Sequence, residues 1–128
     1  MEEKDPIHIE GTDDTPNIRL DSRHNTFEIS GTSNRADIGS FSNLILGWLD
    51  HYASNPNPST QFTFRLDYFN SASSKMLLDI LSRLENMYQA GNDVVVKWCY
   101  KAENQDMRTA GDEYAEMVEV PFENICIN

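Results

Sequence analysis

The chain has 128 residues, of which 39% are hydrophobic and 24% are charged. This balance is typical of one globular domain, since domains contain roughly 150 residues. Its 21 acidic and 10 basic side chains give a net charge of −11, which argues against binding to nucleic-acid phosphates or to an anionic membrane, because both need clustered lysine and arginine. We therefore expect a single domain over residues 1–128 that binds neither nucleic acid nor a membrane.

The cysteines and the N-terminal residues indicate a compartment. Cys99 and Cys126 lie in apolar runs, and two thiols cannot form a disulfide scaffold, so each is predicted to be a small core or strand residue. Residues 1–5 are acidic and lack the apolar segment of a signal peptide. No apolar stretch approaches the roughly 20 residues that span a bilayer. These features predict a cytoplasmic protein.

The first 30 residues show strand patterns. Ile7–Glu10 is a short candidate strand, followed by a cluster of turn residues over 11–16. Ile18–Asp21 and Thr26–Ser30 each alternate apolar and polar residues, and four polar residues join them. This pattern predicts a hairpin with one buried face.

A helix and a strand are predicted next. Apolar residues recur at helical spacing over Ile38–Tyr52, and the prolines at positions 56 and 58 end this pattern because proline cannot continue a helix. The apolar residues of Phe62–Leu66 alternate with polar ones, which predicts a strand with one apolar face.

The second half of the chain repeats this alternation. Met76–Tyr88 carries the strongest helical stripe in the chain, and Gly91 lies just past its end, where a C′ glycine is expected. Val94–Tyr100 is rich in β-branched and aromatic residues and predicts a buried strand. Asp106–Val118 predicts a shorter helix, and residues 120–127 predict an edge strand whose start is weakened by a proline.

The predicted order of elements is β-ββ-α-β-α-β-α-β. Strands that alternate with helices indicate βαβ units with right-handed crossovers. The chain is thus predicted to be one α/β domain, in which helices pack on a mixed sheet of about five or six strands that begins with a hairpin.

Several kinds of chemistry have no signature in the sequence. His8, His24 and His51 are scattered, and no metal-ligand spacing occurs. The glycines match no nucleotide-binding loop, and no serine lies in a nucleophile motif. We therefore expect no metal, no cofactor and no catalytic residue.

One polar segment joins a predicted strand to the longest predicted helix. It runs from Asp67 to Lys75 and contains Ser71, Ser73 and Ser74. A helix N-terminus presents free N–H groups and a partial positive charge, so the fold would tolerate a phosphate on a hydroxyl here. The alternative is that Asn70 or Ser71 is only the N-cap and that the other serines fill the first turn.

At this segment the sequence resembles the SiaC-type regulatory phosphoproteins of bacteria. The resemblance covers nearly the whole chain, and its most specific part surrounds the three serines. The stretches that carry it are Ile9–Pro16, Phe27–Gly31, Trp48-Leu49 with Asn55–Pro58, Tyr68–Asp79 and Pro121-Phe122.

The resemblance implies a fold like that of the STAS anti-sigma-factor antagonists, and a function in partner switching. A cognate Ser/Thr kinase adds a phosphate, a PP2C-type phosphatase removes it, and the unphosphorylated form binds an effector, such as a diguanylate cyclase, and activates it. By this resemblance the phosphoacceptor is Ser71, directly after Asn70. Family members often have threonine at this position, so Ser73 and Ser74 are rival acceptors.

The same resemblance implies a partner-contact surface around the acceptor, formed by Tyr68, Phe69, Asn70 and Lys75. Two other functions stay open. A small serine-dependent hydrolase would need a histidine base within hydrogen-bonding reach of Ser71. A structural subunit without regulation is favoured if the serines are buried.

Overall fold

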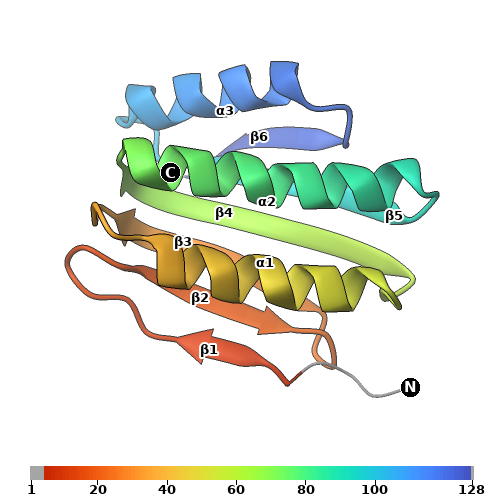
Figure 1. The fold of residues 1–128 in the computed structure, drawn as a ribbon. Helices are drawn as coiled ribbons and strands as arrows, with labels where there is room; N and C mark the ends of the chain where they lie inside the picture. The colour runs from red at the N-terminus through yellow and green to blue at the C-terminus, as the bar shows by residue number, and fades with distance from the viewer. Residues whose placement is uncertain (1–4, 128) are drawn as a thin grey trace.

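The computed structural model describes residues 5–127. Strands and helices alternate in the predicted order (Figure 1). The elements are β1 (Ile7–Ile9), β2 (Pro16–Asp21), β3 (Thr26–Ser33), α1 (Gly39–Ala53), β4 (Ser59–Phe69), α2 (Ser71–Gln89), β5 (Asp93–Tyr100), α3 (Gln105–Met117) and β6 (Phe122–Cys126). The predicted α/β class and mixed sheet are confirmed. Among the described residues, no helix has the length and apolar character needed to cross a membrane.

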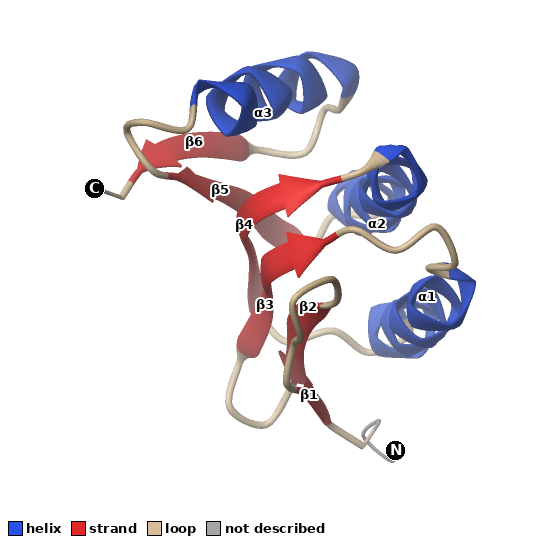
Figure 2. Ribbon diagram, turned by 90° about the vertical axis from the view of Figure 1, so that its left-hand side faces the viewer, coloured by secondary structure: helices blue, strands red, loops and turns tan. Residues whose placement is uncertain are grey.

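The six strands form one sheet in which spatial order equals sequence order, β1-β2-β3-β4-β5-β6. β1, β2 and β3 pair antiparallel, which confirms the predicted hairpin. The pairs β3–β4, β4–β5 and β5–β6 are parallel, and a helix makes each of these connections. Because right-handed crossovers that all step in one direction leave their helices on one side, the three helices cover a single face (Figure 2).

The core lies between this face and the helices. The predicted apolar stripes of the first two helices point into it, and Ile45, Leu77 and Leu81 are at most 1% exposed. Phe62, Phe64, Val96 and Trp98 contribute the facing side chains of the central strands. The longest helix ends as predicted, with Gly91 at φ +102°, a conformation that residues with a Cβ rarely adopt.

The third helix sits directly on Trp98. The indole Nε1 of Trp98 donates to the carbonyl of Met107 at 2.9 Å. A Cβ on Gly111 would lie 2.5 Å from Trp98 Cδ1, so only glycine allows α3 to approach this closely. This glycine inside a helix is therefore explained by packing.

The predicted stripes leave the core at the helix ends. Tyr88 is 40% exposed, and where the spacing of the third helix allows Met117 or Val118 to face inward, Met117 is 62% exposed and Val118 packs against the core. Tyr88 and Met117 each lie within the last two residues of their helices. Helical spacing alone cannot show where such a face stops being covered.

The sheet face opposite the helices is polar. Cross-strand neighbours of opposite charge occur there: Arg19 is paired in register with Glu28, and Lys97 Nζ lies 2.6 Å from Glu123 Oε1. Cys99 is also on this face, yet it is only 6% exposed. Burial raises the pKa of the Cys99 thiol, and the nearby Arg65 charge offsets part of that effect.

We expect Leu81→Asp to lower the free energy of unfolding by several kcal/mol, because it places an unpaired carboxylate in the core. Ser82→Asp, on the exposed neighbouring position of α2, should change stability little. Chemical denaturation of both variants measures this. Equal stability of the two variants would show that the assigned face is wrong.

The two thiols should react at very different rates. Cys126 is exposed, whereas Cys99 is buried with a raised pKa and so holds less of the reactive thiolate at a given pH. With a disulfide reagent near pH 8, we expect one fast thiol and one at least about tenfold slower, the slow rate rising with pH. Cys126→Ser should remove the fast phase, and a fast phase that persists in this variant would contradict the assignment.

Candidate functional site

All three helices begin at the carboxyl-terminal edge of the sheet, where the parallel strands end, on the left in Figure 1. At this edge β4 ends at Phe69, α2 begins at Ser71, and Asn70 alone connects them. Hydrogen bonds tie the neighbouring connections to this point. Asn70 N donates to the carbonyl of Ser33 at 3.0 Å, and Asn104 Nδ2 donates to the carbonyl of Asp67 at 2.9 Å.

Asn70 is the N-cap of α2, one of the two alternatives left open by the sequence. Its backbone is extended, and its Oδ1 accepts a hydrogen bond from Ser73 N at 2.9 Å. Its Nδ2 donates to the carbonyl of Arg35 at 3.0 Å. One amide thus satisfies an orphan N–H of the helix and also fixes the loop between β3 and α1.

The three serines of this segment have different environments. Ser71, the first residue of α2, is exposed, and its hydroxyl has no hydrogen bond to any described residue. Ser73 is fully buried: its Oγ lies 2.6 Å from Ser33 Oγ and donates to the Ser33 carbonyl at 3.0 Å. Ser74 is half-buried, with its Oγ 2.9 Å from the Tyr114 hydroxyl.

The two serine pairs hold the first turn of α2 in place. Tyr114 donates to the Ser74 carbonyl at 3.1 Å, so the Ser74 hydroxyl donates in turn to the tyrosine oxygen. Burial raises the pKa of Tyr114, although the hydrogen bond from Ser74 offsets part of this rise. Local sequence patterns could not predict that Ser33 and Tyr114 bind this segment, because each contacts it from 40 residues away.

The two aromatic residues before Asn70 point in different directions. In the β3–β4 register Gly31 is opposite Leu66, but Thr32 is opposite Tyr68, so Asp67 is an extra residue in β4. Such a bulge reverses the alternation of side chains that follows it. Tyr68 is therefore 51% exposed, whereas Phe69 packs inward against the rings of Trp98 and Tyr114.

Cationic side chains also lie at this edge. Lys75, which is exposed one turn after the start of α2, has its Nζ 3.4 Å from Asp79 Oδ2. Lys101 Nζ lies 3.4 Å from Asp67 Oδ1. Of the predicted contact residues, Tyr68 and Lys75 thus present exposed side chains, while Asn70 and Phe69 make contacts within the fold.

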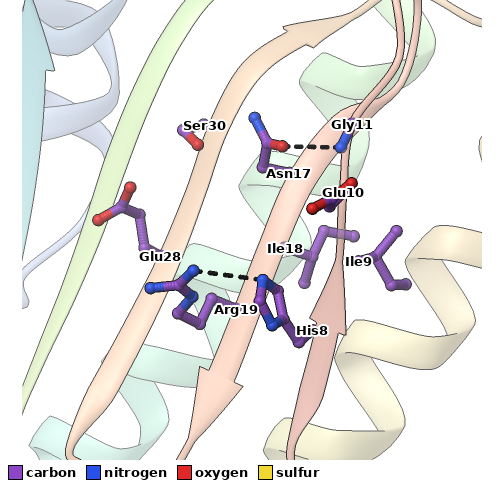
Figure 3. A pocket seen from close by; sticks show the side chains of 9 residues that line it. All are labelled: His8, Ile9, Glu10, Gly11, Asn17, Ile18, Arg19, Glu28 and Ser30. Carbon is purple, nitrogen blue, oxygen red and sulfur yellow. Dashed lines mark hydrogen bonds between the residues drawn. The ribbon is translucent and has the colours of Figure 1, made fainter.

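The histidines are at other places. His8 Nε2 lies 3.2 Å from Arg19 Nη2, in a shallow hollow on the polar sheet face (Figure 3). His24 Nδ1 lies 2.7 Å from Asp21 Oδ2 in the hairpin turn, and His51 is in the last turn of α1, at the opposite end of the helix layer from Ser71. Within residues 5–127, no group of three metal-ligating side chains could hold a metal ion.

The amino-acid sequence matches a known protein family and a protein of Pseudomonas aeruginosa over most of its length. The sequence profile described as "SiaC family regulatory phosphoprotein" matches residues 9–127. An uncharacterised protein of Pseudomonas aeruginosa, PA14_02130, is 28% identical over 116 residues, which are 91% of this chain and 92% of that protein.

Solved structures from Pseudomonas aeruginosa are similar over nearly the full length. Apo-SiaC has a TM-score of 0.87 at 25% identity, with 96% of this chain and 100% of that chain covered. A chain in the crystal structure of the diguanylate cyclase SiaD in complex with its activator SiaC has a TM-score of 0.88 at 26% identity, with 94% and 99% covered.

We expect Asn70→Ala to cost about 1–2 kcal/mol of stability, because the N–H of Ser73 loses its acceptor and the loop carbonyl loses its donor. Asn86→Ala, at an exposed position inside the same helix, is the matched control and should cost nothing measurable. Thermal unfolding of both variants measures the difference. Equal melting temperatures would show that the cap is not needed.

Proposed function

Because the chain belongs to the SiaC family of regulatory phosphoproteins, we propose that it is a phosphorylation-controlled activator of a diguanylate cyclase. The observation that carries this proposal is its similarity, along nearly the whole chain, to a solved complex of such a cyclase with its activator SiaC. The chain itself performs no chemistry in this scheme. Its role is to bind the effector in one covalent state and to leave it in the other.

The proposed phosphoacceptor is Ser71. Its hydroxyl is exposed and free of internal hydrogen bonds, so a kinase can reach it without opening the fold. The buried hydroxyl of Ser73 and the Ser74–Tyr114 pair are poorer targets, since modification there would break contacts between elements. A cognate kinase transfers a phosphoryl group from a nucleoside triphosphate to Ser71 Oγ, which loses its proton, and a PP2C-type phosphatase restores the hydroxyl with water.

The phosphate acts on binding rather than on folding. It adds about −1.5 to −2 charges at the positive end of a 19-residue helix, where the fold tolerates an anion. An effector packed over Tyr68, Ser71 and Lys75 would have to desolvate this dianion, which is costly without a pairing cation. Asn70 and Phe69 hold this surface in place through contacts within the fold, Asn70 with Ser73 and Arg35 and Phe69 with the core rings. The unphosphorylated chain is therefore the binding form.

A serine hydrolase is less consistent with the structure. His8 and His24 contact Arg19 and Asp21 in the antiparallel part of the sheet, and His51 lies at the far end of α1. None of these positions supplies a base to Ser71. The serines meet the criterion for a purely structural subunit only in part, because Ser73 is buried but the proposed acceptor Ser71 is exposed.

We expect Ser71→Ala to keep effector binding and to lose regulation by the kinase. Ser71→Asp should weaken binding, although one carboxylate is a poor copy of a phosphate. Ser82→Asp, which adds the same charge farther along α2, is the control and should bind normally. The measurements are phosphosite mapping by mass spectrometry after kinase treatment, and affinity for the diguanylate cyclases of the native host.

Two results would contradict the proposal. Phosphate found only on Ser73 or Ser74 would place the acceptor elsewhere in the segment. Stoichiometric phosphate on Ser71 that leaves cyclase binding and cyclic-di-GMP production unchanged would show that the chain is not a switch of this kind.

A further inference from the structure

The loop between β3 and α1 carries a cation, Arg35, that has no acidic partner among residues 5–127. Arg35 is exposed, and the only hydrogen bond it makes within this range is the one that its carbonyl accepts from Asn70 Nδ2. Its guanidinium makes no ion pair or hydrogen bond with another residue of the described range 5–127. Of the other cations at this edge, Lys75 and Lys101 already lie beside Asp79 and Asp67, and Arg108 belongs to the first turn of α3.

Hydrogen bonds on both sides fix the position of this loop. Asn70 holds the end of β3 through its backbone N–H to Ser33, and the loop itself through its side chain to Arg35, each at 3.0 Å. Asn34 N donates to the carbonyl of Asp14 at 2.9 Å. The backbone of residue 35 is thus held beside residue 70, one position before the proposed acceptor, although the two segments are 35 residues apart in sequence.

We propose that Arg35 pairs with the phosphate on Ser71 and so stabilises the phosphorylated state. This inference rests on the proposed function, because it requires phosphate at that residue. A long guanidinium side chain that starts beside Asn70 is within reach of a phosphoserine at position 71. Its planar fork can donate two parallel hydrogen bonds to two phosphate oxygens, whereas an ammonium group acts as a point charge without this fixed geometry.

Lys75 is a weaker candidate for this role. It is one turn after Ser71 in the same helix, where an acidic group at i and a lysine at i+4 attract each other only slightly. To turn to the phosphate it would have to leave Asp79, and a cation near the helix N-terminus opposes the helix dipole. Arg35 has neither cost, since it comes from outside the helix and its guanidinium has no partner to lose among the described residues.

The pairing can be measured with phosphoserine incorporated at position 71 during translation, which needs no kinase. Phosphorus NMR then follows the second ionisation of the phosphate, which ordinarily has a pKa of about 6. A neighbouring guanidinium favours the dianion and lowers this pKa. We expect Arg35→Ala to raise the pKa by about half a pH unit, the scale of an exposed ion pair.

Matched variants separate this contact from general charge effects. Arg35→Lys should give a smaller rise than Arg35→Ala, and Lys75→Met a rise smaller still. Arg108→Ala, which removes an exposed arginine on α3, should leave the pKa unchanged. Arg35→Ala keeps the backbone carbonyl that Asn70 binds, so the fold and the cap stay intact.

The proposal is overturned if Arg35→Ala leaves the phosphate pKa unchanged, or if Lys75→Met shifts it more than Arg35→Ala does. These outcomes differ from failure of the proposed function. A kinase that never modifies Ser71, or a cyclase that ignores the phosphate, would reject the switch while the NMR titration still reported the contact with Arg35.

Discussion

The handedness of the crossovers is the constraint on which the arrangement depends. Four parallel strands follow one another across the sheet in sequence order, and each is joined to the next by a helix. A right-handed connection then leaves every helix on the same face and every helix start at the same edge. Segments that are distant in sequence, around residues 33–35, 70–75 and 101–104, meet there without any long loop.

At that edge, the one-residue connection between β4 and α2 determines which serine hydroxyls are exposed. A single residue, Asn70, turns the chain from β4 into α2 and uses both ends of its amide, one toward the helix and one toward the neighbouring loop. The hydroxyls that follow are thereby given different environments, so that Ser73 belongs to the interior and Ser71 to the surface. A rigid support and an accessible group next to it suit a site where a covalent change must be read by another protein.

The order and type of the elements could be predicted from the sequence because each depends on local spacing. The stripes over Ile38–Tyr52 and Met76–Tyr88 have the helical period, and the hairpin strands have the period of two. The wrong assignment of Tyr88 arose at a helix end, where burial depends on what lies opposite and not on spacing. The cap was also predictable, since Asn70 or Ser71 were the two candidates.

The residues that surround the candidate site could not be predicted from the sequence. The bulge at Asp67 depends on how β4 pairs with β3, and without it Tyr68 and Phe69 would exchange their inner and outer positions. Ser33, Arg35 and Tyr114 reach the first turn of α2 only through parallel pairing and helix packing. A pattern within one segment contains no information on such partners, because they are set by topology.

The sequential order of the strands also has a kinetic meaning. Every strand pairs only with its predecessor and its successor, so the chain closes one βαβ crossover after another and never has to bring its two ends together. Among sheets with parallel strands, this order keeps the sequence separation between paired strands as small as a helical crossover allows, and larger separations slow folding. During synthesis, β1 to β5 and the first two helices can assemble before α3 and β6 have been made. The last strand, β6, then pairs with β5, which is already in place.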